Sequence, residues 1–335
     1  MKKAMIALIG ACVVFLAGQV SAEPITLKFS TVVPPKAHPA SVVMKPWSDM
    51  VTKESNGALK IELYPGGLLG SNVKMYFQQI ESGVFDIALI YPGYFGDRFI
   101  DLTFPFIPFT AETYIEGALA LQRMTDRGLI RGFEGFQVLM NVATSPFYAN
   151  TTFPLRMPED FKGRKMRSGN QFQAKLLPAL GSTPFDIPVN KSAESMSRGL
   201  VEGTIESPSS ITAFGGDKVA KHHLRVPMGS SVLSIVMGKA KYESLPPQAK
   251  SVIDKFKGEF FSRYWAERLA PFEDKEVEAW KKSPDHTVVV PSAAEMDAWK
   301  KAIQPIIDDY LKDNPKLKEL LQIYHEELAK VRAGR

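Results

Sequence analysis

Short apolar runs alternate with longer amphipathic stretches along the chain after residue 24. Residues 25–32, 59–64 and 86–90 have the alternating or continuously apolar patterns of strands, whereas residues 41–55 and 72–81 have the apolar spacing of helices. Pro65-Gly66-Gly67 ends the second of these strands. Because strand and helix alternate, the pattern predicts a parallel sheet with helices on both faces.

The same alternation returns in the middle of the chain. Residues 136–142, 164–167 and 183–188 read as strands and residues 171–180 as a helix, while the intervening residues 145–158 are rich in Pro, Thr and Asn. This pattern predicts two α/β domains, the first formed by residues 23–145 plus about 232–270 and the second by residues 146–231 plus about 271–335. Residues 247–282 are helical in composition, and we expect one helix there that is longer than one domain and is kinked or split at Pro271.

The N-terminus has the features of a secretory signal. Lys2 and Lys3 precede an uncharged, mostly apolar run over residues 4–20, and Val20-Ser21-Ala22 supplies small residues for cleavage. We therefore expect residues 1–22 to be a cleaved signal peptide, rather than a membrane anchor or a lipoprotein signal, and the mature protein to be soluble and exported. Cleavage removes Cys12, the only cysteine, and this excludes disulfides, a thiolate nucleophile and cysteine-ligated metals.

Composition and motifs narrow the functional classes. The chain has 41 Lys and Arg against 36 Asp and Glu, and an excess of this size without basic runs does not indicate nucleic-acid binding. The sequence contains no G-x-S-x-G, P-loop, G-x-G-x-x-G or H-E-x-x-H motif. His222 and His223 are adjacent and would point apart, so we expect no metal site, and no cofactor is indicated.

Several stretches resemble one family of binding proteins. Residues 63–70 (LYPGGLLG), followed by residues 79–88, are similar to its strand, turn and helix with L-G and G-x-x-D elements. Residues 161–167 (FKGRKMR) resemble its K-G-x-K-x-R strand, and residues 197–208 resemble its helix end, turn and proline. Residues 102–106 and 242–248 match two further segments in the same order. The family is the substrate-binding proteins of tripartite ATP-independent periplasmic (TRAP) transporters, of the DctP type.

The resemblance implies a two-domain periplasmic binding protein fold of the α/β class, similar to type II, with a central cleft and a long helix bridging the domains. It also implies a non-catalytic monomer that closes around a small organic acid and delivers it to the TRAP membrane permease. The arginine of the family's K-G-x-K-x-R strand, which holds the ligand carboxylate, corresponds to Arg167. A guanidinium suits this role because it can bind both carboxylate oxygens and keeps its charge in a partly dry cleft.

Further residues are candidates for ligand contact. Phe147 and Tyr148 lie where the chain crosses between domains, and their rings favour a ligand with an apolar or ring-containing body. Tyr91 and Tyr94 follow a strand end, where α/β sheets present ligands. In the family's Q-E-N-P segment an asparagine contacts the ligand, whereas this chain has residues 204–208 (TIESP).

We expect Ser207 to donate a hydrogen bond in place of that asparagine. If Glu206 faces the cleft, it repels a carboxylate and accepts a hydrogen bond from a ligand hydroxyl instead. We therefore expect a monocarboxylate, an aromatic or hydroxy/keto acid ahead of a sugar acid. The alternatives are a receptor of an ABC transporter, a sensory periplasmic protein with the same fold, and an exported enzyme acting on small carboxylates.

Overall fold

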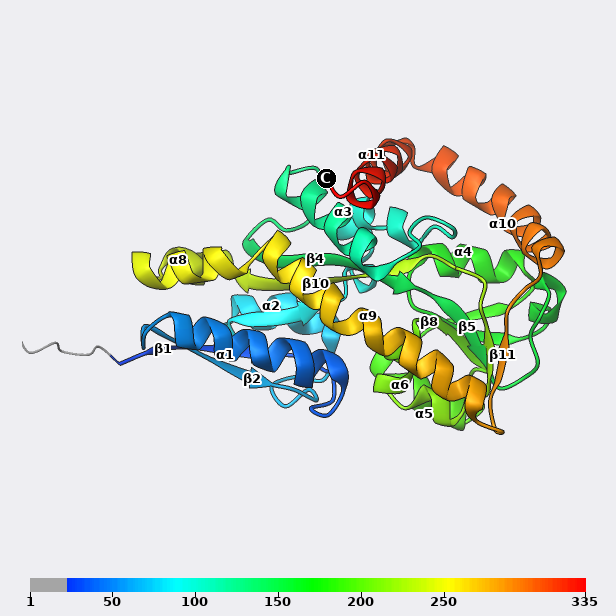
Figure 1. The fold of residues 1–335 in the computed structure, drawn as a ribbon, viewed down its shortest axis with the longest axis horizontal. Helices are drawn as coiled ribbons and strands as arrows, with labels where there is room; N and C mark the ends of the chain where they lie inside the picture. The colour runs from blue at the N-terminus through cyan, green and yellow to red at the C-terminus, as the bar shows by residue number, and fades with distance from the viewer. Residues whose placement is uncertain (1–22) are drawn as a thin grey trace, which may run out of the picture.

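The computed structural model describes residues 23–335, so the expected signal peptide at 1–22 lies outside the described residues. The first of two sheets has the strand order β2-β1-β3-β10-β4 (Figure 1). Its strands are β1 (Ile25–Ser30), β2 (Leu59–Tyr64), β3 (Ile87–Ile90), β4 (Phe136–Pro146) and β10 (Ser230–Gly238). Strands β1, β2 and β3 are parallel, as expected, but β10 lies antiparallel between β3 and β4. The sheet is therefore mixed, because a strand returning from the second domain enters it.

The second sheet has the order β11-β9-β5-β8-β6-β7. Strand β5 pairs antiparallel with β8 and β9, and the remaining pairs are parallel. The strands are β5 (Tyr148–Thr151), β6 (Lys165–Ser168), β7 (Thr183–Asp186), β8 (Gly203–Glu206), β9 (His222–Leu224) and β11 (Thr287–Val289). Each sheet thus forms the centre of one α/β domain, which agrees with the expected fold class.

Helices cover both sheets (Figure 1). The α-helices are α1 (Lys45–Glu54), α2 (Tyr76–Glu81), α3 (Tyr114–Asp126), α4 (Gln171–Ala179), α5 (Ser192–Ser197), α6 (Pro208–Ala213), α7 (Lys239–Glu243), α8 (Pro247–Phe256), α9 (Glu259–Lys282), α10 (Ala293–Asp313) and α11 (Pro315–Arg332). Short 3-10 or π segments are η1 (Pro39–Met44), η2 (Val73–Met75), η3 (Pro92–Tyr94), η4 (Gly96–Leu102), η5 (Phe104–Phe106), η6 (Pro158–Phe161), η7 (Val189–Lys191) and η8 (Gly216–Lys218).

Two crossover segments lie side by side between the sheets. Strand β4 ends at Pro146 and β5 begins at Tyr148, while residues 225–229 lead from β9 back to β10. The Phe147 N–H donates to the Gly229 carbonyl (2.7 Å), and the Met228 N–H donates to the Phe147 carbonyl (2.9 Å). The chain therefore leaves the first sheet and returns to it through two segments joined by hydrogen bonds.

The expected long helix is two helices. Helix α8 ends at Phe256 and α9 begins at Glu259, because Gly258 has a φ of +64°, which other residues rarely adopt. Pro271 lies inside α9 and does not split it, so the break was expected at the wrong residue. Helix α9 nevertheless bridges the domains: Trp265 is buried in the first core and Trp280 in the second (Figure 1).

The two C-terminal helices belong to different domains. Helix α10 packs on the second domain, where the Trp299 indole N–H donates to the Arg156 carbonyl (3.0 Å). Helix α11 returns to the first domain, where the Tyr324 hydroxyl contacts the Gly117 carbonyl of α3 (3.4 Å). This differs from the expectation that all of residues 271–335 lie in the second domain, because the buried face of α11 packs against α3 of the first domain.

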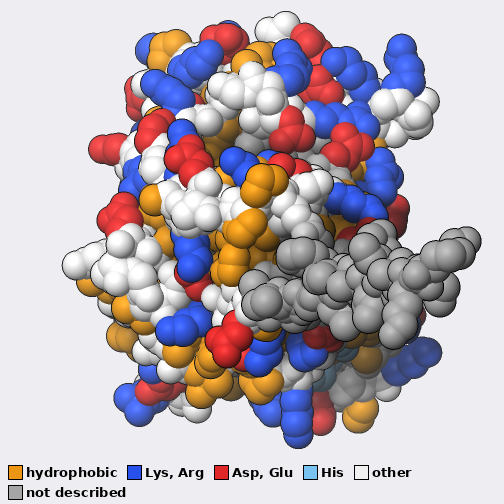
Figure 2. Space-filling view, turned by 90° about the vertical axis from the view of Figure 1, so that its left-hand side faces the viewer, with side chains coloured by type: hydrophobic (Ala, Val, Ile, Leu, Met, Phe, Trp, Pro, Cys, Tyr) orange, Lys and Arg blue, Asp and Glu red, His pale blue; other side chains and the backbone are white. Residues whose placement is uncertain are grey.

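Charged side chains of both signs are mixed over the face that Figure 2 shows, with hydrophobic side chains exposed between them. This mixture fits the small excess of basic over acidic residues, 41 against 36. Within residues 23–335, no helix combines the length and the hydropathy that a membrane span requires. Attraction of an anion to this protein therefore has to come from individual placed groups and not from a strongly basic surface.

Candidate binding site

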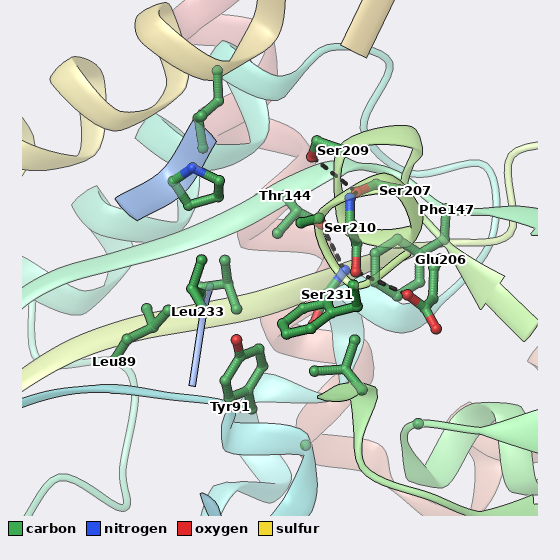
Figure 3. A pocket seen from close by; sticks show the side chains of 18 of the residues that line it. Leu89, Tyr91, Thr144, Phe147, Glu206, Ser207, Ser209, Ser210, Ser231 and Leu233 are labelled. Carbon is green, nitrogen blue, oxygen red and sulfur yellow. Dashed lines mark hydrogen bonds between the residues drawn. The ribbon is translucent and has the colours of Figure 1, made fainter. Parts of the chain in front are cut away.

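A cavity lies between the two domains and opens to solvent. Its empty space, including the mouth, is about 770 Å³. Both domains and α9 contribute to its wall, which is mainly aromatic and aliphatic: Val33, Leu89, Tyr91, Tyr94, Tyr114, Phe147, Val189, Phe214, Leu233, Trp265 and Leu269. Polar side chains gather on the side of the second domain, at β6, β8 and α6 (Figure 3). The cavity therefore suits a compact ligand with an apolar body and one polar end.

Strand register brings the polar group together. Arg167 of β6 lies beside Thr204 of the parallel strand β8. Side chains two residues apart on a strand share a face, so Glu206 points to the same side as Thr204. The Arg167 Nη1 donates to Thr204 Oγ1 (3.2 Å) and to Glu206 Oε1 (3.0 Å). A T-x-E sequence on the neighbouring strand thus supplies the partners of the arginine.

Arg167 is buried and extensively hydrogen-bonded. Its side chain is 3% exposed, its Nε donates to the Ile187 carbonyl (2.7 Å), and its Nη2 donates to the Tyr94 hydroxyl (3.0 Å). A guanidinium has five N–H groups, and these two bonds together with the two bonds of Nη1 use four of them. One N–H on Nη2 is therefore left without a partner among the described residues. Gly169 makes room for the guanidinium, since a Cβ at this position would lie 2.9 Å from Nη2. The arginine is therefore held in place before any ligand binds.

Glu206 forms a buried ion pair with Arg167 instead of facing a ligand hydroxyl. Its side chain is 1% exposed, and its Oε1 also accepts from Ser192 Oγ (2.9 Å) and Thr204 Oγ1 (2.7 Å). Its Oε2 accepts from Ser210 Oγ (2.9 Å). The expectation that Glu206 accepts from a ligand is thus not supported, because protein donors already occupy this carboxylate. The burial of Arg167 opposes its charge, but Tyr94 and Glu206 outweigh this effect and hold the pKa of Arg167 above its usual value.

Tyr94 connects the two domains at the arginine. It lies in η3 of the first domain, and its hydroxyl accepts from Arg167 Nη2 (3.0 Å) and from the Val189 N–H (2.8 Å), both in the second domain. Burial raises the pKa of Tyr94, so the hydroxyl keeps its proton. Because both hydrogen bonds are accepted, that proton is free to be donated elsewhere. Tyr94 and the free Arg167 N–H together form a pair of donors.

The structure places the remaining candidates differently. Phe147 lines the cavity, and Ser207 also lines it while its Oγ accepts from the Ser210 N–H (3.2 Å) as the N-cap of α6. Tyr148 is not among the residues that line the cavity. Its ring packs instead against the Arg225 guanidinium, 3.5 Å from the ring centroid. Tyr148 is thus separated from the site for which it was predicted.

Sequence reasoning missed the contribution of the long helix. Trp265 and Leu269 of α9 line the cavity, and the Trp265 indole N–H donates to the Tyr114 hydroxyl (2.6 Å). Glu273 of α9 accepts from the Ser209 N–H (3.0 Å), and burial raises the pKa of this carboxyl. No local motif marks these residues, but their apolar spacing on a helix expected to bridge both domains was a usable signal.

The histidine pair does not form a metal site in the described part of the chain. Residues 23–335 hold no group of three or more His, Cys, Asp or Glu arranged to bind a metal ion. His223 is bonded through Nδ1 to Asn150 Oδ1 (2.7 Å) and through Nε2 to His286 Nδ1 (2.9 Å), and its ring stacks on Trp280. Both nitrogens of this buried ring are therefore engaged with other side chains.

Known proteins resemble the chain over nearly its whole length. The profile of bacterial extracellular solute-binding protein family 7 (DctP) matches residues 29–313. The C4-dicarboxylate-binding periplasmic protein DctP of Rhodobacter capsulatus is 27% identical over 322 residues, covering 90% of this chain and 92% of that protein.

Solved structures show the same fold. A TRAP solute-binding protein from a marine metagenome, described as specific for aromatic acids and solved with 3-hydroxybenzoate, has a TM-score of 0.86 and 26% identity, covering 92% of this chain and 99% of that chain. A TRAP solute-binding protein from Rhodoferax ferrireducens, solved with benzoate, has a TM-score of 0.86 and 24% identity, covering 93% and 100% of the two chains. The chain therefore belongs to the bacterial extracellular solute-binding proteins of family 7, and the resemblance to TRAP solute-binding proteins is confirmed.

Proposed function

We propose that this protein captures an aromatic monocarboxylate in the periplasm and delivers it, without chemical change, to the membrane permease of a TRAP transporter. The observation that carries the proposal is a single buried arginine at the polar end of an otherwise apolar, aromatic cavity. Relatives of the chain are solute-binding components of transporters, which favours binding over catalysis.

The number of cationic groups favours a ligand with one carboxylate. Among the described residues that line the cavity, Arg167 is the only Lys, Arg or His. Glu206 already balances the charge of Arg167, and the wall has no further cation for a second carboxylate, so burying that second charge in a partly dry cavity is costly. The proposal therefore differs from the C4-dicarboxylate named for the Rhodobacter capsulatus relative.

The aromatic side chains of the cavity wall favour an aromatic body in the ligand. Tyr91, Tyr94, Phe147, Phe214 and Trp265 surround the space that the ligand would fill. Aromatic rings pack on one another in stacked or edge-to-face arrangements, which stabilise more than buried area alone. A sugar acid presents hydroxyls around its ring and offers these aromatic side chains less apolar surface to pack on. The aromatic ligands of the marine metagenome protein support the same ranking.

In the proposed complex the free Arg167 N–H and the Tyr94 O–H donate to the two carboxylate oxygens. Hydrogen bonds to a charged group contribute about 1.5–3 kcal/mol each. Because Glu206 already balances the charge of Arg167, these two hydrogen bonds contribute more to ligand binding than the net charge of the site does. One ion pair between the two domains also favours the closed arrangement: Lys74 pairs with Asp186 (2.9 Å).

A ligand panel tests the proposal. Thermal-shift measurements on the purified protein would include benzoate, mandelate, succinate, malate, galacturonate and glucuronate. We expect the aromatic monocarboxylates to raise Tm and the others to leave it unchanged, since only a ligand that binds the folded state stabilises it. Native mass spectrometry of protein purified from its host would identify a co-purified acid directly. Stabilisation by dicarboxylates or uronates alone would refute the assignment of ligand class.

A further inference from the structure

Tyr91 and Tyr94 are neighbours in space with different hydrogen-bonding states. Their rings stack with centroids 5.6 Å apart and an angle of 28° between their planes. The Tyr94 hydroxyl accepts from Arg167 and Val189, whereas the Tyr91 hydroxyl makes no hydrogen bond within residues 23–335. The two tyrosines therefore contribute different groups to the same cavity, one fixed and one free.

The free hydroxyl points into the cavity. Figure 3 shows the Tyr91 ring directed from the end of β3 toward the open space beside Leu233. Of the neighbouring hydroxyls, that of Thr144 is already engaged, since its Oγ1 accepts from the Ser231 N–H (3.0 Å) and donates to the Ser145 carbonyl (3.0 Å). Tyr91 thus offers a polar atom to a ligand on the wall of the first domain, away from the ion pair formed by β6 and β8.

An enclosed hydroxyl of this kind discriminates between ligands. An apolar ligand surface pressed against it removes water and leaves the hydroxyl without a partner, which is unfavourable, whereas a ligand oxygen restores a hydrogen bond. Burial raises the pKa of Tyr91 well above its usual value, so the phenol is neutral and can both donate and accept. The group therefore suits a hydroxyl or keto oxygen on the ligand.

We propose that Tyr91 sets the specificity of the site: its hydroxyl binds a hydroxyl or keto oxygen carried by the ring of the ligand, while Arg167 and Tyr94 hold the carboxylate. The ligand is then a hydroxy- or keto-substituted aromatic monocarboxylate, selected over the unsubstituted acid. This inference rests on the proposed function and adds a role for one residue.

The test compares two Tyr→Phe variants against two kinds of ligand. Calorimetric titrations of the wild type, Tyr91→Phe and Tyr94→Phe would use benzoate and the three isomers of hydroxybenzoate. We expect the wild type to prefer at least one hydroxybenzoate over benzoate. Tyr91→Phe should weaken binding of that isomer by about 3- to 10-fold, as expected for one neutral hydrogen bond, while benzoate affinity should stay the same or rise, because the variant has no hydroxyl that benzoate would leave without a partner. Tyr94→Phe should weaken benzoate and hydroxybenzoate by the same factor.

The outcomes are separable. Equal weakening of benzoate and hydroxybenzoate in Tyr91→Phe would overturn the inference, because Tyr91 would then contact the ring or the carboxylate only. A wild type that binds all four acids with equal affinity would also overturn it while leaving the proposed function in place. A wild type that binds none of them would overturn the proposed function, and the inference with it. Unchanged Tm of ligand-free Tyr91→Phe serves as the control for folding, whereas Tyr94→Phe should lower Tm because Arg167 and Val189 lose an acceptor.

Discussion

Replacing Arg167 with methionine should abolish acid binding and also destabilise the protein. Arg167 and Glu206 are 3% and 1% exposed and lie 3.0 Å apart, so the substitution leaves a carboxylate buried without its counter-charge. Breaking a buried pair by removing one partner costs about 3–5 kcal/mol. Because proteins are stable by only about 5–15 kcal/mol, a loss of binding in this variant alone would not separate a binding role from partial unfolding.

A second substitution separates the two effects. In the Arg167→Met background, Glu206→Gln removes the uncompensated charge, and the glutamine carbonyl can still accept from Ser192 or Thr204. We expect the double variant to recover most of the lost stability, with a residual loss of about 1–2 kcal/mol from altered hydrogen bonds. Acid binding should stay absent, because the donor for the carboxylate is still missing.

The assays are urea unfolding at pH 7 for stability and calorimetric titration for binding. Near-equal m-values in the wild type and both variants would show that the same surface is exposed on unfolding. The reasoning would be refuted if Glu206→Gln restored no stability to Arg167→Met, since Glu206 would then not be the charge that Arg167 compensates. Acid binding by the double variant with wild-type affinity would refute the role of Arg167 in holding the carboxylate.

Two further predictions concern stability. Burial, with smaller contributions from His286, His222, Lys221 and Arg225, lowers the pKa of His223 to about 3. Only the unfolded chain then takes up this proton as the pH falls below about 6.5, so the free energy of unfolding should fall by about 2 kcal/mol between pH 7.5 and pH 5. Gly229→Ala should cost about 3 kcal/mol, since φ is +83° and a Cβ would lie 2.1 Å from the Phe106 carbonyl oxygen. The matched Gly83→Ala, with φ of +74° and nothing within 4 Å, should cost only about 1–2 kcal/mol.

Each of these predictions has its own control. His223→Gln should unfold with a shallower pH dependence between pH 6.5 and pH 4 than the wild type, and identical slopes would contradict the contribution of His223. Urea unfolding of the two glycine variants measures what the close approach of Gly229 to Phe106 adds to the cost of a side chain. Equal losses in the free energy of unfolding in both variants would contradict a cost from this approach.

Local patterns predicted much of the fold. The strands at 25–30, 59–64, 87–90 and 165–168 and the helix at 171–179 follow period or composition signals within short windows. The pattern was insufficient for β10, because a strand that returns from the other domain has no neighbour in sequence to indicate its direction. The helix break was also expected at the wrong place. Pro271 is tolerated inside α9, whereas Gly258, with its positive φ, separates α8 from α9.

Individual residues of the site could be predicted from the sequence, but the contacts between them could not. Arg167, Tyr91 and Tyr94 were expected near the ligand, and the structure brings them to one cavity. The pairing of Arg167 with Glu206 was missed, because it depends on the register of β6 against β8, which no single segment encodes. Tyr148 was misplaced because the faces of a short strand at a domain crossing cannot be assigned without its partners.

The connections between the domains limit how they can move. The two hydrogen-bonded crossover segments and helix α9 join the domains at the back of the cavity, and the α10–α11 pair adds a fourth connection over the outside. Such tethers oppose separation along the line between the domains and leave rotation about the crossovers as the easy motion. An overlong ligand would therefore hold the front edges apart and keep Tyr94 away from Val189. The protein therefore selects for ligand length as well as for the shape of the cavity wall, because the Tyr94 hydroxyl can accept from the Val189 N–H only when the ligand is short enough.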